Sequence, residues 1–166
     1  MESVVYRRDT TNQQFKPIEL NLFSLVNQNV QLLQNQALAK NIQIVVDVPD
    51  QHRLFADENM ISAIIRNLLN NAIKFSTYGK LIKISSVEKP NELQLIVKDQ
   101  GIGISDEVIR DIFSKDKMVS SAGTNKEKGS GLGLKIVQEF AKKNKGVIQI
   151  NSKVGDGTEM IISFKK

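Results

Sequence analysis

Residues 58–76 constrain the fold more than any other segment, because they predict a long helix with two different faces. The segment reads ENMISAIIRNLLNNAIKFS, and Asp57, directly before it, is a suitable N-cap. Asn67, Asn71 and Lys74 fall within a narrow arc at about 100° per residue. We expect a helix to about Lys74 whose adjoining side packs in the core through Ile61, Ile64, Ile65, Leu68 and Ala72.

The polar arc of Asn67, Asn71 and Lys74 has two interpretations. Amide oxygens are hard, neutral ligands that suit Mg²⁺, and an ammonium group suits phosphate. A polar stripe is also the normal solvated side of an amphipathic helix. The arc by itself leaves both interpretations open.

The remaining segments predict one α+β domain over residues 15–166, preceded by a connector over residues 1–14. We expect a two-layer sandwich of helices packed on a mixed, mostly antiparallel sheet. A long polar segment, residues 114–129, predicts a functional or disordered loop. Periodicity and turn signals predict helices over 20–39, 57–74, 105–113 (capped by Ser105) and 131–144, strands over 42–48, 81–87 and 92–99, and a hairpin over 146–164.

Composition removes several kinds of chemistry. The 166 residues are enough for one core, and 40% are hydrophobic. The chain has no Cys, which excludes a thiol nucleophile and a Cys-bound metal. His52 is the only His, so a polyhistidine metal site is excluded as well. We expect His52 to be exposed in a turn between a strand and a helix.

The charge distribution argues against a nucleic-acid partner. The net charge is +5, but Lys and Arg are interleaved with Asp and Glu, and aromatic residues make up only 5% of the chain. A basic chain can equally hold a polyanionic small molecule. The sequence has neither an apolar run of membrane-spanning length nor a signal-peptide pattern. We expect a cytoplasmic domain, with membrane anchoring of the parent protein left open.

Two glycine-marked motifs could contact a nucleotide. DQGIG, residues 99–103, places Asp99 at a strand end, where its carboxylate can accept a hydrogen bond from an exocyclic amine. The neighbouring glycines would let a flat base approach the backbone, although a plain turn explains the motif too. GSGLGL, residues 129–134, begins a helix, where free backbone N–H groups can bind phosphate. A flexible hinge is the alternative, and the spacing fits neither the P-loop nor the dinucleotide fingerprint.

In this order and at these separations, the three motifs resemble the ATP-binding domain of sensor histidine kinases, in the Bergerat-fold group of ATPases. NLLNNAIKF is similar to the N box of that family, DQGIGI to its first glycine box and GSGLGLKIV to its second. Phe113 matches the F-box position, but SKDK stands where a second aromatic is expected. The resemblance covers residues 15–164.

The resemblance implies a Mg–ATP site. Asn71 would bind Mg²⁺, while Asn67 and Lys74, the candidate catalytic residues, would reach the phosphates or metal-bound water. Asp99 would accept the adenine amino hydrogen, with Thr158 nearby through water. Residues 114–128 would form the ATP lid, with Lys115, Lys117, Lys126 and Lys128 as candidate phosphate contacts. The further cofactor-binding residues would be Phe75, Gly101, Gly103, Ile104, Phe113, Gly129, Ser130, Gly131, Leu132, Gly133 and Leu134.

The resemblance also implies partners that this chain lacks. The γ-phosphoryl group would go to a His on a separate dimerisation domain, in a pathway that ends on a response regulator receiver domain. The chain would then be a monomeric fragment, with residues 1–14 the remnant of the preceding helix and linker.

Asn67 distinguishes between enzyme classes. The hydrolysing relatives, such as gyrase and the heat-shock chaperones, carry a Glu four residues before the metal-binding Asn, where this chain has Asn67. An amide cannot act as a general base, so a kinase domain is favoured over an ATP hydrolase. A docking module that has lost its nucleotide affinity is a further alternative. It is disfavoured because Asn71, Asp99 and GSGLGL are all present.

Overall fold

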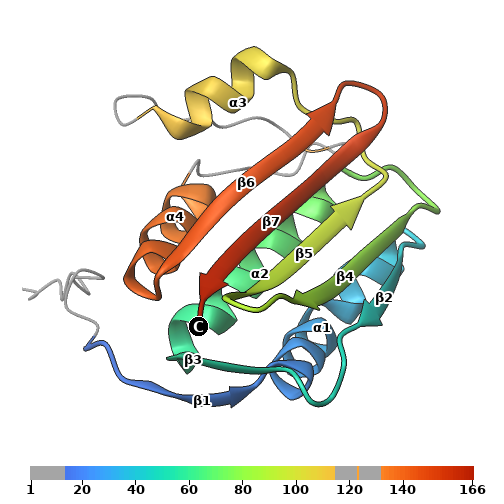
Figure 1. The fold of residues 1–166 in the computed structure, drawn as a ribbon. Helices are drawn as coiled ribbons and strands as arrows, with labels where there is room; N and C mark the ends of the chain where they lie inside the picture. Colours follow the sequence, from blue (N-terminus) through green and yellow to red (C-terminus); the bar gives the residue numbers. More distant parts are fainter. Residues whose placement is uncertain (1–13, 115–122, 124–131) are drawn as a thin grey trace, which may run out of the picture.

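The structure, a computed structural model, describes residues 14–114, 123 and 132–166. Helices cover one face of a five-stranded sheet, whose other face is not covered by any described element (Figure 1). A separate two-stranded sheet lies at one end of the molecule. In chain order the elements are β1 (Pro17–Asn21), α1 (Leu22–Ala39), β2 (Gln43–Asp47), β3 (Arg53–Asp57), α2 (Glu58–Phe75), β4 (Leu81–Glu88), β5 (Glu92–Asp99), α3 (Asp106–Phe113), α4 (Gly133–Lys143), β6 (Gly146–Lys153) and β7 (Gly157–Lys165).

The topology confirms the expected α+β sandwich. The strand order of the large sheet is β2-β4-β5-β7-β6. β2 and β4 are parallel, and each of the other neighbouring pairs is antiparallel. None of the helices in the described part of the chain is both long and apolar enough to cross a membrane.

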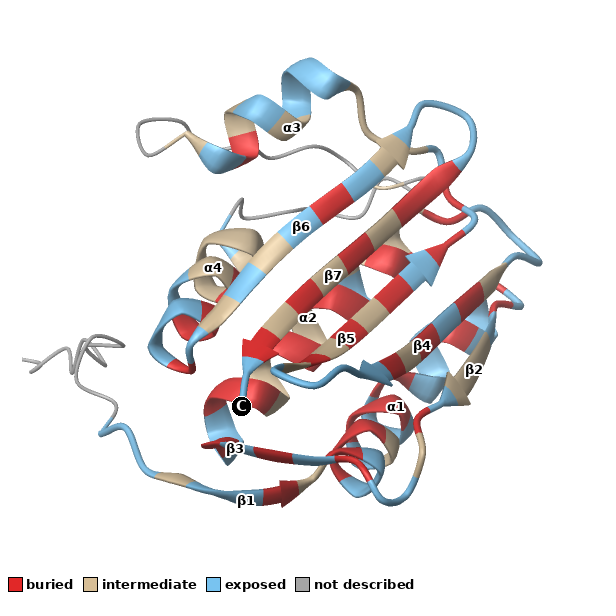
Figure 2. Ribbon diagram, viewed as in Figure 1, coloured by how far each residue is buried: buried red, intermediate tan, exposed pale blue. Residues whose placement is uncertain are grey.

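The core lies between the sheet and the helices. Alternate residues of β5, namely Leu93, Leu95 and Val97, are buried against α2 (Figure 2). α2 also packs against α1 and α4, and the aliphatic side predicted for it is buried throughout. Full burial of a side chain such as Leu68 stabilises the fold by about 1.5–3 kcal/mol. α2 is therefore the central helix of the domain.

Side-chain caps fix where two helices begin. Asp57 Oδ1 accepts a hydrogen bond from the Met60 N–H at 3.0 Å, as the sequence predicted. The other oxygen of Asp57 accepts from the Lys16 N–H at 2.8 Å, which ties the chain before β1 to the start of α2. Ser105 caps α3 in the predicted way, because its Oγ accepts from the Val108 N–H at 3.3 Å.

The small sheet was not predicted. The sequence indicated a helix from residue 20, but Leu20 belongs to β1, which pairs antiparallel with β3. α1 begins two residues later, at Leu22, because the Asn21 side chain caps it by accepting from the Ser24 N–H. Strands of five residues give a weak alternation signal, and their pairing partner lies far away in the sequence.

The prediction for His52 was wrong. The residue is 6% exposed, because the turn between β2 and β3 packs against the end of β4. His52 Nδ1 lies 2.7 Å from the Ser86 Oγ, and Nε2 lies 3.9 Å from a carboxylate oxygen of Glu88. A buried imidazole with polar partners at both nitrogens is a structural feature of this turn.

Candidate nucleotide-binding site

Asn67, in the polar arc of α2, lies beside Gly133 at the start of α4. Asn67, Asn71 and Lys74 are all half-buried. The Asn67 Nδ2 donates to the Ala63 carbonyl at 2.7 Å, and Oδ1 points towards Gly133. A Cβ atom built on Gly133 would lie 2.9 Å from that oxygen, so the Asn67 side chain would have to shift to admit one. The structure therefore brings the first motif close to the end of the third.

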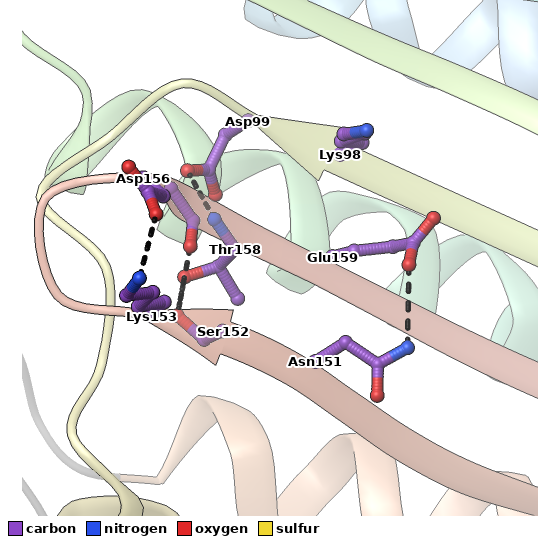
Figure 3. A pocket seen from close by; sticks show the side chains of 9 residues that line it. Lys98, Asp99, Asn151, Ser152, Lys153, Asp156, Thr158 and Glu159 are labelled. Carbon is purple, nitrogen blue, oxygen red and sulfur yellow. Dashed lines mark hydrogen bonds and ion pairs between the residues drawn. The ribbon is translucent and has the colours of Figure 1, made fainter.

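Asp99 lies at the end of β5 with its carboxylate only partly satisfied. Oδ1 accepts from the Gly101 N–H at 2.8 Å. It also accepts from the Thr158 N–H at 3.2 Å (Figure 3). No described residue donates a hydrogen bond to Oδ2. Burial raises the pKa of the Asp99 carboxyl above its ordinary value, and the two backbone N–H groups partly oppose that rise. One oxygen is therefore fixed by the protein, while the other is available to a ligand.

The loop after β5 is held against the end of α2. The Phe75 carbonyl accepts from the Ile102 N–H at 3.1 Å. A Cβ atom on Gly101 would lie 2.5 Å from the same carbonyl oxygen and 2.8 Å from the Asp99 Oδ1. Only glycine lets the backbone come this close. The second motif is thereby joined to the end of the first, next to Phe75, whose ring lies 4.9 Å from the Lys74 ammonium.

The hairpin of β6 and β7 packs against the loop after β5. The Gly155 N–H donates to the Ile102 carbonyl at 2.8 Å, and the Ile104 N–H donates to the Ser152 Oγ at 2.8 Å. Thr158 is the cross-strand partner of Asp99, and its Oγ1 lies 2.8 Å from the Ser152 Oγ. Ser152 was missed by the sequence analysis. Its only signal is that it pairs with Thr158 across the hairpin.

Glycine is also required at two other positions here. Gly103 has a φ of +75°, and a Cβ atom on it would lie 2.1 Å from the Lys153 carbonyl oxygen. Gly157, which the sequence analysis did not single out, has a φ of +89°. A Cβ atom on Gly157 would lie 2.2 Å from the Asp99 carbonyl oxygen. Both glycines allow the loop after β5 and the hairpin to pack backbone to backbone.

The other predicted residues are less closely gathered. Ile104 is half-buried, and Phe113 is 44% exposed at the end of α3. Leu132 is exposed and Leu134 packs against the core. Leu132 precedes α4, which therefore starts without a side-chain cap. Gly129, Ser130 and Gly131 lie outside the described residues, as do the four lid lysines and the rest of the lid apart from Ser114 and Gly123.

A shallow polar hollow of about 340 Å³ adjoins Asp99 and Thr158 but opens on the other face of the sheet (Figure 3). It is lined by Lys98, Asn151 and Glu159, which alternate with the residues buried under the helices. Asn151 donates to the Glu159 carboxylate at 3.3 Å, so polar groups of the hollow bind one another. We place the candidate site on the helix side, because Asp99 is buried in the same alternation as the core residues of β5 and the polar arc belongs to α2.

A comparison with protein-family models identifies the family of this chain. The model, described as histidine kinase-, DNA gyrase B-, and HSP90-like ATPase, matches residues 56–166, more than half of the chain. The chain belongs to this ATPase family. The matched range contains the polar arc, both glycine-marked motifs and Thr158. ATP is therefore the nucleotide that a domain of this family binds.

Within this ATPase family, the similar proteins and solved structures are histidine kinases. The sensor-like histidine kinase SenX3 of Mycolicibacterium smegmatis is 31% identical over 141 residues, which cover 85% of this chain. The histidine protein kinase SaeS of Staphylococcus aureus is 34% identical over 135 residues, or 80% of this chain. The catalytic domain of histidine kinase ThkA superposes with a TM-score of 0.77 at 26% identity, covering 93% of this chain and 97% of that domain.

The chain spans 37% of the length of SenX3 and 37% of SaeS. It covers nearly all of the ThkA catalytic domain, so the two domains have similar extents. The fold and sequence are those of the ATP-binding catalytic domain of sensor histidine kinases.

Proposed function

We propose that this domain positions Mg–ATP for transfer of the γ-phosphoryl group to a histidine on a separate dimerisation domain of the parent kinase. The observation that carries the proposal is the convergence of three motifs on α2. Asn67 meets Gly133 at one point of the helix, and Phe75 meets Gly101 and the Asp99 loop at its end.

The adenine would lie at the C-terminal end of α2. Oδ2 of Asp99 offers an acceptor to the amino group of the base, because Oδ1 is already held by two backbone N–H groups. The absence of a side chain at Gly101 lets the loop backbone pack against the Phe75 carbonyl and the Asp99 Oδ1, which holds this carboxylate beside the end of α2. Thr158, whose hydroxyl contacts the Ser152 Oγ, would support a water beside the base.

The phosphates would lie between the polar arc of α2 and the start of α4. Lys74 supplies a positive charge, and the first N–H groups of α4 carry the positive end of a helix dipole. Within the described residues, no cluster of three His or carboxylate side chains could hold a metal ion. Mg²⁺ usually keeps several waters and binds through substrate phosphates. One amide oxygen, that of Asn71, therefore fits the ion when phosphates supply further ligands.

The same geometry disfavours hydrolysis. A general base must lie within hydrogen-bond reach of the attacking water. Asn67 occupies the position four residues before Asn71, and its amide already donates to the Ala63 carbonyl. Phosphoryl transfer would depend on positioning and on the charge of the metal, and the acceptor would come from outside this chain.

The remaining partner would be a response regulator receiver domain. ThkA has been solved in complex with the response regulator protein TrrA, and that structure matches the fold of this chain with a TM-score of 0.72 at 23% identity. We extend the same kind of partner to the parent protein of this domain.

The test is a transfer assay with γ-labelled ATP, Mg²⁺, this chain and the dimerisation domain of its parent kinase. We expect acid-labile, base-stable label on the dimerisation domain and none when its acceptor His is replaced by Ala. Leaving out Mg²⁺ should abolish transfer. Label that persists on the His-to-Ala domain would count against a histidine acceptor, and no transfer despite bound ATP would count against the kinase assignment.

A further inference from the structure

Lys40 carries a buried ammonium group outside the candidate site. The residue directly follows α1 and is 4% exposed. Its Nζ donates to the carbonyls of Ile73 at 2.8 Å, Lys74 at 3.1 Å and Ser76 at 3.1 Å. An ammonium has three N–H donors, so each has a carbonyl acceptor here.

These three carbonyls form the C-terminal end of α2. The last carbonyls of a helix have no partner within the helix and carry the negative end of its dipole. A single cation from the end of α1 satisfies them and balances that partial charge. The backbone strengthens the same connection, because the Gly79 N–H donates to the Lys40 carbonyl at 2.9 Å.

The end of α2 is also the part of the helix that meets the adenine end of the site. Phe75 lies between the carbonyls that Lys40 binds, and its own carbonyl accepts from the Ile102 N–H at 3.1 Å. Gly101, one residue earlier, donates to the Asp99 Oδ1. Hydrogen bonds joined by short stretches of backbone therefore connect the Lys40 ammonium, through the last turn of α2, to the carboxylate of Asp99.

We propose that Lys40 is a positioning residue for ATP binding, which it supports by holding Lys74 and Phe75 in register with the Asp99 loop. The inference rests on the proposed function. Without the ammonium, three carbonyls at a largely buried helix end would lose their donor. The last turn would then loosen, and the hydrogen bond from Ile102 to Phe75 would weaken with it. Lys40 contacts the site residue Lys74 through its backbone carbonyl, so its effect must pass through the backbone.

The experiment compares Lys40→Met with Ile42→Ala in the 166-residue chain. Met keeps the aliphatic stem and removes all three donors. Ile42 is a buried neighbour, 2% exposed, whose truncation lowers stability by opening a cavity. Both variants are studied at a temperature where circular dichroism shows them fully folded. Mg–ATP affinity is measured by calorimetry, and exchange of the Ile102 and Thr158 amides is followed by NMR.

We expect Lys40→Met to bind ATP about tenfold more weakly, the equivalent of one buried hydrogen bond. Its Ile102 amide should exchange faster, while the Thr158 amide keeps its protection. Ile42→Ala should keep wild-type affinity and wild-type Ile102 exchange, although its melting temperature falls. If Lys40→Met does not fold, Lys40→Gln, which keeps two donors, should show a smaller loss of affinity in the same direction.

A folded Lys40→Met or Lys40→Gln variant with wild-type affinity and unchanged Ile102 exchange would overturn the inference and leave Lys40 as a helix cap only. A wild-type chain that does not bind ATP would instead overturn the proposed function. In that case faster Ile102 exchange in Lys40→Met would still support the positioning role, and unchanged exchange would overturn it.

Discussion

Replacing Asp99 with Asn tests the adenine end of the site with almost no change of shape. The two backbone donors, Gly101 N–H at 2.8 Å and Thr158 N–H at 3.2 Å, require an acceptor and so select the amide oxygen of the new side chain. The amide NH₂ must then take the place of Oδ2. In the proposed complex this NH₂ faces the amino group of adenine, so two donors oppose each other where a charged acceptor stood before.

The loss can be estimated from that single contact. A buried donor left unsatisfied costs about 1–3 kcal/mol, which corresponds to an affinity about 5- to 150-fold lower. Calorimetric titration with Mg–ATP measures it. Asp156→Asn is the matched control, because Asp156 is exposed in the nearby hairpin and only approaches Lys153, at 3.9 Å. That variant should bind ATP like the wild type.

The base itself offers a second comparison for Asp99→Asn. Inosine triphosphate carries a carbonyl oxygen in place of the amino group, and the new NH₂ can donate to it. We expect the variant to lose much more affinity for ATP than for inosine triphosphate, a pattern that general destabilisation would not produce. Equal affinity of the wild type and Asp99→Asn for ATP would remove Asp99 from the base pocket.

Three further outcomes are expected. Burial raises the pKa of Asp99, so its charged form lowers the free energy of unfolding above that pKa. Urea unfolding should therefore show Asp99→Asn to be more stable than the wild type at neutral pH. This difference in stability should shrink as the pH falls towards the ordinary pKa of Asp. An advantage independent of pH would contradict this. Gly101→Ala should lower stability by about 1–3 kcal/mol and should also weaken ATP binding, because its Cβ would lie 2.5 Å from the Phe75 carbonyl oxygen. Unchanged thermal unfolding would show that the loop can move to accept the Cβ without loss of stability. The wild-type chain alone should release phosphate far more slowly than about one per second, because Asn67 cannot take a proton from water. It should not phosphorylate itself, because its His52 is buried. Mass spectrometry that finds phosphate on His52 would refute this.

The sequence predicted those parts of the fold whose signal is local. α2 could be predicted because its aliphatic side recurs at helical spacing over 18 residues. β4 and β5 could be predicted because apolar and polar residues alternate along them. The caps at Asp57 and Ser105 each depend on one short-range hydrogen bond. In each case the residues that form the interaction are neighbours in the chain.

Features that depend on distant segments escaped prediction. β1 and β3 are five residues each, and the hydrogen bond from Lys16 to Asp57 joins residues 41 positions apart. His52 reads as a polar turn residue until β4 supplies Ser86 as its partner. Lys40 likewise reads as an ordinary polar residue at a helix end. The residues of the candidate site were named through motifs, but the contact of Asn67 with Gly133 needed the structure.

α2 connects the two ends of the proposed ligand. Asn67, at the phosphate end, and Phe75, at the adenine end, are eight residues apart, or about 12 Å along a helix that rises 1.5 Å per residue. A nucleoside triphosphate must span this interval between rigid contacts, so any movement of α2 would change both ends together. The helix is fixed at its start by Asp57, which also binds the Lys16 N–H, and at its end by Lys40. Both anchors lie outside the ligand site. Affinity for ATP should therefore depend on residues that never touch it, and at the Lys40 end that dependence should appear as a loosened Ile102 amide before any loss of overall fold.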